Sequence, residues 1–135
     1  SGINLRCVRS IFSRFEDIKK MRSDICLKYL NILERFEIKI SYFKNHHFSK
    51  FPVIFKTESE RVHISNNLLH SGILAGALYP FALNVQPGLR EILNDSFSYK
   101  GADFLSKNLI TLPVNEFVGD PVIDTIDKTF EKFLK

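Results

Sequence analysis

The chain has 135 residues, of which 44% are hydrophobic and 25% charged, and its formal net charge is +4. These values are typical of one globular domain with its own core, and they exclude a fibrous or largely disordered chain. No apolar run approaches the roughly 18 residues of a membrane helix, and no segment has the features of a signal peptide, so we expect a cytoplasmic protein. Two cysteines, Cys7 and Cys26, are too few for a disulfide framework.

Positive charge is concentrated in the first part of the chain. Residues 1–50 hold 11 Lys and Arg against 5 Asp and Glu, whereas residues 51–135 hold 8 against 10. A basic half can bind nucleic acid or an acidic lipid surface, and nucleic-acid binding would weaken steeply with added salt. However, cations such as Lys19 and Lys20 alternate with Glu16 and Asp17, which is typical of a solvated helix face. We therefore expect neither a nucleic-acid partner nor a membrane partner.

A long helix is predicted over residues 11–36. Apolar side chains recur there at intervals of three and four residues, as one face of a helix requires, and no Pro or Gly interrupts them. Cys26 lies on this stripe and is expected to be a buried, reduced thiol. A helix of this length must pack across a whole sheet or against another domain. Residues 1–9 are expected to be a linker or a cloning remnant, and residues 10–135 a single domain.

Two strands and a second helix follow in the predicted order. Residues 38–43 and 51–55 are strand candidates, and Pro52 lies near the start of the second, where a missing N–H donor costs least. Thr57 and Glu60 match a capping box, which predicts the start of a helix. Gly72 is expected to end that helix in the left-handed conformation.

The remaining segments complete an α+β pattern. Residues 74–79 are predicted to form a strand, residues 101–108 a short helix and residues 109–112 another strand. Asp120 and Pro121 are an expected N-cap and first helical residue for a C-terminal helix. The fold class expected is α+β: a small, mostly antiparallel sheet with helices packed on one face and a long N-terminal helix.

The four histidines do not form a recognisable metal or catalytic pattern. His46 and His47 are adjacent, and His63 and His70 are two helical turns apart, about 10 Å by helical rise, which is too far to share one metal without further ligands. No nucleophile elbow, phosphate-binding glycine loop or His-Glu-x-x-His helix occurs. The sequence therefore predicts no catalytic residue and no metal site in this chain.

The best binding candidate is the loop between Pro80 and Pro87. Tyr79, Asn84 and Gln86 offer phenol and amide groups of the kind that bind sugar hydroxyls or a nucleobase. The two prolines restrict the loop and so reduce the entropy lost on binding. The alternative is an ordinary connection between a strand and a helix.

An ordered series of short motifs resembles the C-terminal domain of the DegT/StrS-type nucleotide-sugar aminotransferases. The series runs through nearly the whole chain. Its members are Arg22…Cys26…Tyr29…Leu33, Phe51-Pro52-Val53-Ile54, Glu58-Ser59-Glu60-Arg61, Leu68-Leu69-His70-Ser71-Gly72-Ile73, Tyr79-Pro80, Gln86-Pro87, Ala102…Leu105 and Leu112-Pro113. Family members usually carry His at the positions of Leu78 and Asn84, and Pro at the position of Ala82.

The resemblance implies a role in sugar-nucleotide binding without catalysis by this chain alone. Enzymes of this family use pyridoxal phosphate to transfer an amino group from glutamate or glutamine to a nucleotide-linked keto sugar, and their aldimine lysine and cofactor-binding residues belong to a larger domain. The implied role of this chain is dimerisation and closure of the sugar-nucleotide site, with Tyr79, Asn84 and Gln86 toward the substrate and no cofactor of its own. The implied partner is a second copy or an upstream catalytic domain. The alternative is a free-standing sugar-nucleotide-binding or protein-interaction module.

Overall fold

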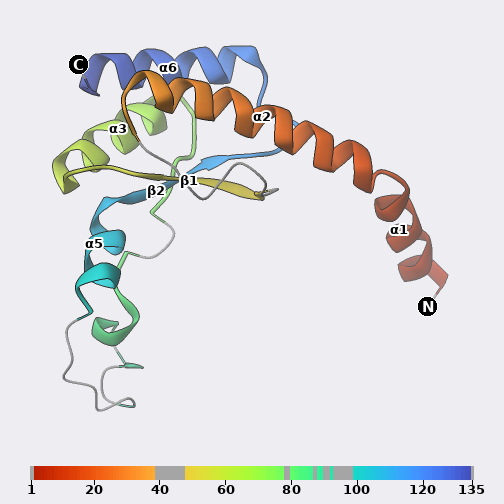
Figure 1. Cartoon of the computed structure of the whole chain (residues 1–135). Coiled ribbons are helices and arrows are strands. Elements are labelled where there is room, and N and C mark those ends of the chain that lie inside the picture. The colour runs from red at the N-terminus through yellow and green to blue at the C-terminus, as the bar shows by residue number, and fades with distance from the viewer. Residues whose placement is uncertain are drawn as a thin grey trace.

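A computed structural model describes residues 2–38, 48–77, 80–86, 88–89, 92 and 99–134 of the chain. These residues form mostly helices, with two strands between them (Figure 1). In chain order the elements are α1 (Gly2–Ser13), α2 (Phe15–Arg35), β1 (Lys50–Ile54), α3 (Glu58–His70), the 3₁₀ turn η1 (Leu83–Val85), α5 (Lys100–Asn108), β2 (Leu109–Pro113) and α6 (Asp120–Leu134). The α+β class predicted from the sequence is confirmed.

The sheet is an antiparallel pair of β1 and β2. The register places Phe51 opposite Leu112 and Val53 opposite Ile110, and all four side chains are buried. Because side chains alternate along a strand, the residues between them point to the other face of the sheet. That second face is formed by Lys50, Pro52, Ile54, Leu109, Thr111 and Pro113.

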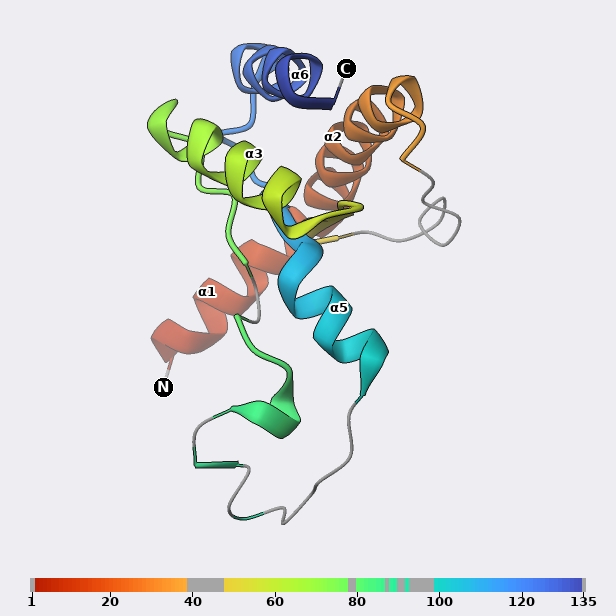
Figure 2. The ribbon, with the colours of Figure 1, turned by 90° about the vertical axis from the view of Figure 1, so that its left-hand side faces the viewer.

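Helices α2, α3 and α6 cover the first face, whereas α5 and the segment around η1 lie on the other side (Figures 1 and 2). The core between these helices and the sheet centres on Tyr29, Phe55 and Phe130, each at most 2% exposed. The Tyr29 hydroxyl donates a 2.9 Å hydrogen bond to the Pro113 carbonyl oxygen, which ties α2 to the end of β2. Helices from both ends of the chain therefore share one core with the central strands.

Two exposed ion pairs join α2 to α6. Lys28 Nζ lies 2.6 Å from Asp120 Oδ1, and Arg35 donates to Asp127 Oδ2 at 2.8 Å. The hydrogen bond with Asp120 raises the pKa of Lys28 and lowers that of Asp120. Both groups are solvent-exposed, so this pair adds little to stability.

Helix α3 begins and ends as the sequence predicted. The Glu60 amide donates to Thr57 Oγ1 at 3.2 Å, and Glu60 Oε2 accepts from the Thr57 amide at 3.2 Å, which completes the capping box. At the other end Gly72 has φ of +78°, and the Ile73 amide bonds to the Leu68 carbonyl oxygen. This is the arrangement in which a left-handed glycine closes a helix.

Removal of the Thr57 cap should destabilise the protein measurably. We expect Thr57→Ala to lower the free energy of unfolding by about 1 kcal/mol, because the Glu60 amide loses its partner. Thr57→Ser keeps the hydroxyl and should stay close to the wild type. Urea unfolding of the three proteins provides the measurement, and equal midpoints for Ala and wild type would contradict the capping role.

The N-terminal helical segment is longer than predicted and extends beyond the body. The expected helix over 11–36 is present, but helical structure already begins at Gly2, and the path bends at Arg14, between α1 and α2 (Figure 1). The stripe is buried only in the second half of α2, whereas Ile11 and Phe15 are 61% and 50% exposed. The assignment of residues 1–9 as a linker stays a prediction.

Two predicted boundaries are wrong in detail. Residues 74–77 form no strand; they contribute a single bridge between Gly76 and Thr111, because the Ala75 amide turns back to the Ile73 carbonyl oxygen. The last helix starts at Asp120, and the Gly119 carbonyl oxygen accepts its first hydrogen bonds, while the Asp120 carboxylate binds Lys28. The predicted strand over 38–43 lies almost wholly outside the described residues.

Candidate functional site

An open cavity of about 920 Å³ lies beneath the second face of the sheet. Its size is within the range of small-molecule sites. The loop around η1 and helix α5 form its walls. The lining residues that the structure describes are Phe48, Ser49, Lys50, Pro52, Phe81, Ala82, Leu83, Gln86, Ala102, Leu105, Ser106, Leu109 and Thr111.

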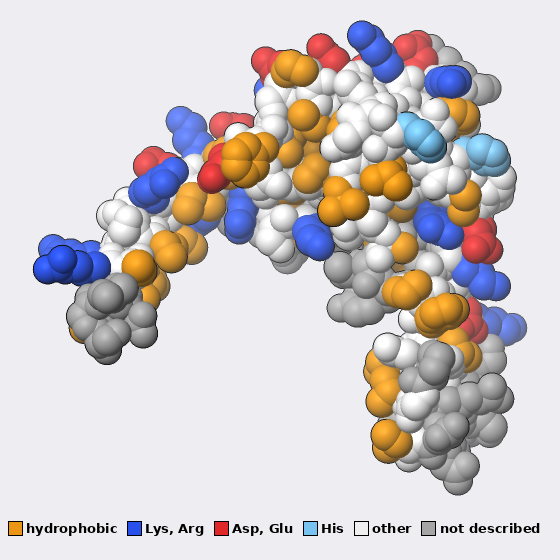
Figure 3. Space-filling view, turned by 180° about the vertical axis from the view of Figure 1, so that it is seen from behind, with side chains coloured by type: hydrophobic (Ala, Val, Ile, Leu, Met, Phe, Trp, Pro, Cys, Tyr) orange, Lys and Arg blue, Asp and Glu red, His pale blue; other side chains and the backbone are white. Residues whose placement is uncertain are grey.

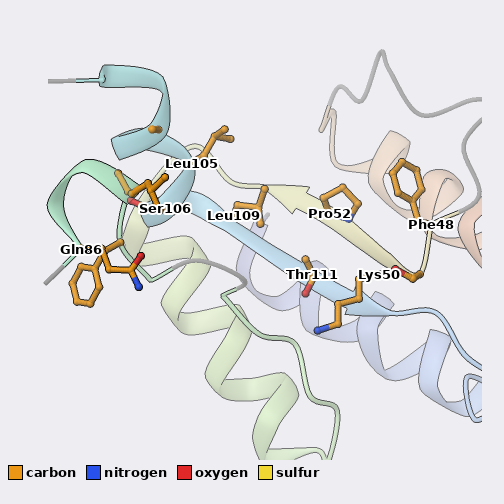
Figure 4. A pocket seen from close by; sticks show the side chains of 13 residues that line it. Phe48, Lys50, Pro52, Gln86, Leu105, Ser106, Leu109 and Thr111 are labelled. Atoms are coloured by element: carbon orange, nitrogen blue, oxygen red, sulfur yellow. The ribbon is translucent and has the colours of Figure 1, made fainter. Parts of the chain in front are cut away.

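The cavity lies against the second face of the sheet, the face opposite to α2, α3 and α6. Pro52 and Thr111 are opposite each other in the register and form its floor, with Leu109 beside them. Figure 4 shows Gln86, Leu105 and Ser106 at one end and Phe48 and Lys50 at the other, with the strand residues between them. Residues from three separate segments of the chain, 48–52, 81–86 and 102–111, therefore meet here.

The lining is mainly apolar, and its polar groups are few. Thr111 Oγ1 lies 3.3 Å from the Gly76 carbonyl oxygen, and Ser106 Oγ donates to the Asp103 carbonyl oxygen at 2.9 Å. The Gln86 side chain is exposed, and Lys50 is the one charged residue among the described lining. Such a site suits a flat or apolar group with a few hydrogen-bonding atoms at its edge.

The three residues predicted to bind the substrate differ from one another in their position relative to the cavity. Gln86 lines the cavity. Asn84 belongs to η1, is partly buried and is not among the lining residues, and Tyr79 lies outside the described residues. The substrate-binding role of all three stays a prediction.

Most of the cavity was not identified from the sequence. The floor residues Pro52, Leu109 and Thr111 belong to predicted strands. The alternation of side chains along a strand separates its two faces, but it does not say which face borders the cavity. Ala102 and Leu105 were noted only as a motif of the α5 segment. The sequence signal that could have pointed to the cavity is the presence of two large apolar residues, Phe81 and Leu83, in the predicted binding loop, and the structure shows both to be exposed.

The cysteine and histidine side chains that the structure describes make contacts within the fold. Cys26 is 6% exposed, as predicted, and burial raises the pKa of its thiol. His63 stacks on Phe133 with ring centroids 6.2 Å apart. Within the described parts of the chain, no three His, Cys, Asp or Glu side chains are close enough to bind a metal ion, and no helix has both the length and the hydropathy to cross a bilayer.

Comparison with known proteins gives a match at the level of structure alone. No family model and no curated protein sequence matches the chain. A solved structure, provisionally described as the sugar aminotransferase Spr1654 from Streptococcus pneumoniae in its PMP-form, has 19% sequence identity and a TM-score of 0.61. The match covers 91% of this chain and 32% of that one, so this chain spans about a third of the enzyme's length. The chain therefore has an aminotransferase-like fold of small-domain size.

Proposed function

We propose that this chain is the small domain of a sugar aminotransferase-like enzyme, in which it helps to close a sugar-nucleotide site. The observation that carries the proposal is the shared fold over 91% of the chain with about a third of a protein described as a sugar aminotransferase. The motif series and the cavity beside Gln86 support it. Association with a second copy or with a catalytic domain belongs to the same proposal.

The chemistry of the cavity fits part of a nucleotide-linked sugar. Phe48, Phe81 and Pro52 offer flat apolar surfaces for a base or a sugar ring. The Gln86 amide can both donate and accept hydrogen bonds, and Lys50 at the rim can approach a phosphate. No carboxylate lines the described cavity, so an anionic ligand meets no like charge there.

The same residues do not fit pyridoxal phosphate. Lys50 is the one lysine among the described lining, and it is exposed, whereas a lysine that binds this cofactor covalently is normally shielded from water. No Asp or Glu of the described lining is available to pair with the pyridine nitrogen. We therefore assign cofactor chemistry to another part of the enzyme and no catalytic residue to the described lining of this cavity.

Filling the cavity should abolish ligand binding. Ala102 is exposed on the α5 wall, so Ala102→Phe adds bulk to the cavity without disturbing the core. We expect titration calorimetry with a set of uridine and thymidine diphosphate sugars to show binding by the wild type, and no binding by Ala102→Phe. Gln86→Ala should weaken binding about tenfold, the effect of one lost hydrogen bond.

Asn66→Ala is the matched control, because Asn66 is exposed on α3 and is not part of the lining. It should bind like the wild type. Equal affinity of Ala102→Phe and the wild type would show that nucleotide sugars bind elsewhere. Absence of binding by the wild type would overturn the assignment of this cavity as part of the nucleotide-sugar site.

A further inference from the structure

A second, smaller cavity lies at the end of β1, on the side of the molecule where α2 and α6 also end (Figure 1). Its volume is about 310 Å³, the lower limit for a small-molecule site. None of its described lining residues belongs to the first cavity. They are Phe36, Glu37, Ile38, Ile54, Phe55, Lys56, Glu60, Phe104 and Leu134. We call this space the end cavity.

Aromatic and aliphatic side chains form the floor and walls of the end cavity. Phe55 is 2% exposed, and its ring lies 5.8 Å from that of Phe130 in the core. The Phe36 ring lies 6.2 Å from the same Phe130 ring, so one buried neighbour supports both. Ile54 and Phe104 are 37% and 46% exposed. An apolar ligand in the cavity would therefore remove these two side chains from water, which favours binding. Figure 3 shows that hydrophobic side chains reach the surface in several places, and here they line a hollow.

The charged groups of the described lining are two carboxylates and one ammonium. Glu60 Oε2 accepts hydrogen bonds from the amides of Lys56 and Thr57 at 3.1 and 3.2 Å. These bonds fix the Glu60 carboxylate and use Oε2, which leaves Oε1 available to a ligand. Glu37 is exposed and supplies the second carboxylate. Lys56 is also exposed, so its ammonium can extend into water. The end cavity therefore presents a net negative charge.

Two helix ends add to this negative potential. Phe36 is the C-cap of α2, and Leu134 is the last residue of α6. The last carbonyl groups of a helix have no partner within the helix and carry partial negative charge, which favours a cation nearby. The N-terminus of α3 has the opposite sign, but the acidic residues Glu58 and Glu60 in its first turn offset it. Side chains and backbone therefore favour the same ligand, a cation with an apolar part.

We propose that the end cavity binds a small primary amine with an aliphatic chain. The chain packs on Phe36, Phe55 and Phe104, and the ammonium donates hydrogen bonds to the carboxylates of Glu37 and Glu60. An alcohol of the same length gains the apolar contacts alone, and a carboxylate of the same length meets like charge. This inference goes beyond the proposed function and does not depend on it, because the two cavities share no described lining residue.

Three ligands of equal chain length, hexylamine, hexanol and hexanoate, test the proposal. Titration of the whole chain at neutral pH, followed by the shifts of its backbone amide resonances in NMR spectra, gives the affinity for each ligand and locates its site. We expect hexylamine to bind in the millimolar range, at least about threefold more tightly than hexanol, because it adds ion pairs to the apolar contact. Hexanoate should not bind. The largest shifts should fall on Glu37, Phe55, Lys56 and Leu134.

Removal of one carboxylate tests the role of charge. Glu37→Gln keeps the size of the side chain and removes its negative charge, so it should weaken hexylamine binding about threefold and leave hexanol binding unchanged. Glu116→Gln is the matched control, because Glu116 is exposed and lies outside the end cavity. Glu60 is left intact, since its carboxylate also caps α3.

Truncation of a wall residue tests the apolar contact. Phe104→Ala should weaken hexylamine and hexanol alike, whereas Phe117→Ala, at a side chain that is 82% exposed and outside the cavity, should weaken neither. All four substituted side chains are exposed, so the variants should keep the wild-type circular dichroism. Absence of hexylamine binding, hexanol binding as tight as that of hexylamine, equal effects of Glu37→Gln and Glu116→Gln, or shifts confined to the first cavity would each overturn the proposal.

Discussion

Phe130→Ala should lower the free energy of unfolding by about 3–5 kcal/mol, the range measured for large-to-small changes of buried aromatic residues. Phe130 is fully buried on α6, and its ring meets Phe55 at 5.8 Å and Phe36 at 6.2 Å in edge-to-face geometry. Phe55 directly follows β1, Phe130 belongs to α6, and Phe36 is the C-cap of α2. Truncation of Phe130 therefore leaves a cavity where the end of β1 meets these two helices.

The control for this change uses the same substitution at the surface. Phe117 is 82% exposed, so Phe117→Ala should change the free energy of unfolding by no more than about 0.5 kcal/mol. Chemical denaturation of the two variants and the wild type gives the comparison. A loss below about 1 kcal/mol for Phe130→Ala would show that α6 does not pack as described.

Tyr29→Phe should also destabilise the fold, by about 0.5–1.5 kcal/mol, since the partly buried Pro113 carbonyl oxygen loses the hydroxyl that donates to it. Tyr29 is fully buried and its ring packs on Phe51 at 5.3 Å, so the substitution keeps the ring contact and removes only the hydrogen bond. Stability equal to the wild type would mean that this hydrogen bond contributes nothing. Urea unfolding at neutral pH provides the measurement.

The same variant should change the response of stability to alkaline pH. Burial raises the pKa of Tyr29 in the folded protein above the value of about 10 that the unfolded chain has. Above pH of about 10 the unfolded state releases this proton while the folded state keeps it, so stability is full below that pH and falls as pH rises, by up to about 1.4 kcal/mol per unit. In Tyr29→Phe this contribution is absent, and the decline above that pH should be shallower. Identical slopes would contradict the assignment.

Local signals in the sequence predicted the elements whose ends are fixed by nearby side chains. Thr57 and Glu60 define the start of α3, and Gly72 defines its end, because each acts on backbone groups within a few residues. In residues 74–77, the described part of the strand predicted over 74–79, there is one bridge, because a turn between Ile73 and Ala75 removes an amide from the ladder. A two-residue alternation of apolar and polar residues does not indicate such a turn.

In the candidate site, too, some residues could be predicted from local sequence signals and others could not. Gln86 was predicted from its residue type and its place in a loop between two prolines, and the structure puts it at the cavity. Pro52 and Thr111 were read as ordinary strand residues. Their place on the cavity floor follows from the pairing of strands about 60 residues apart, which no local pattern specifies.

The sequence by itself determined the α+β class, the long N-terminal helix, the caps of α3 and the buried state of Cys26, since periodicity and capping act over one or two helical turns. Only the tertiary structure decided which sheet face carries the helices and which face borders the cavity. It also decided that the apolar stripe of the long helix is buried around Tyr29 but exposed around Phe12. Both residues follow the same helical pattern, and what distinguishes them is whether the strands and α6 lie beneath the helix at that point.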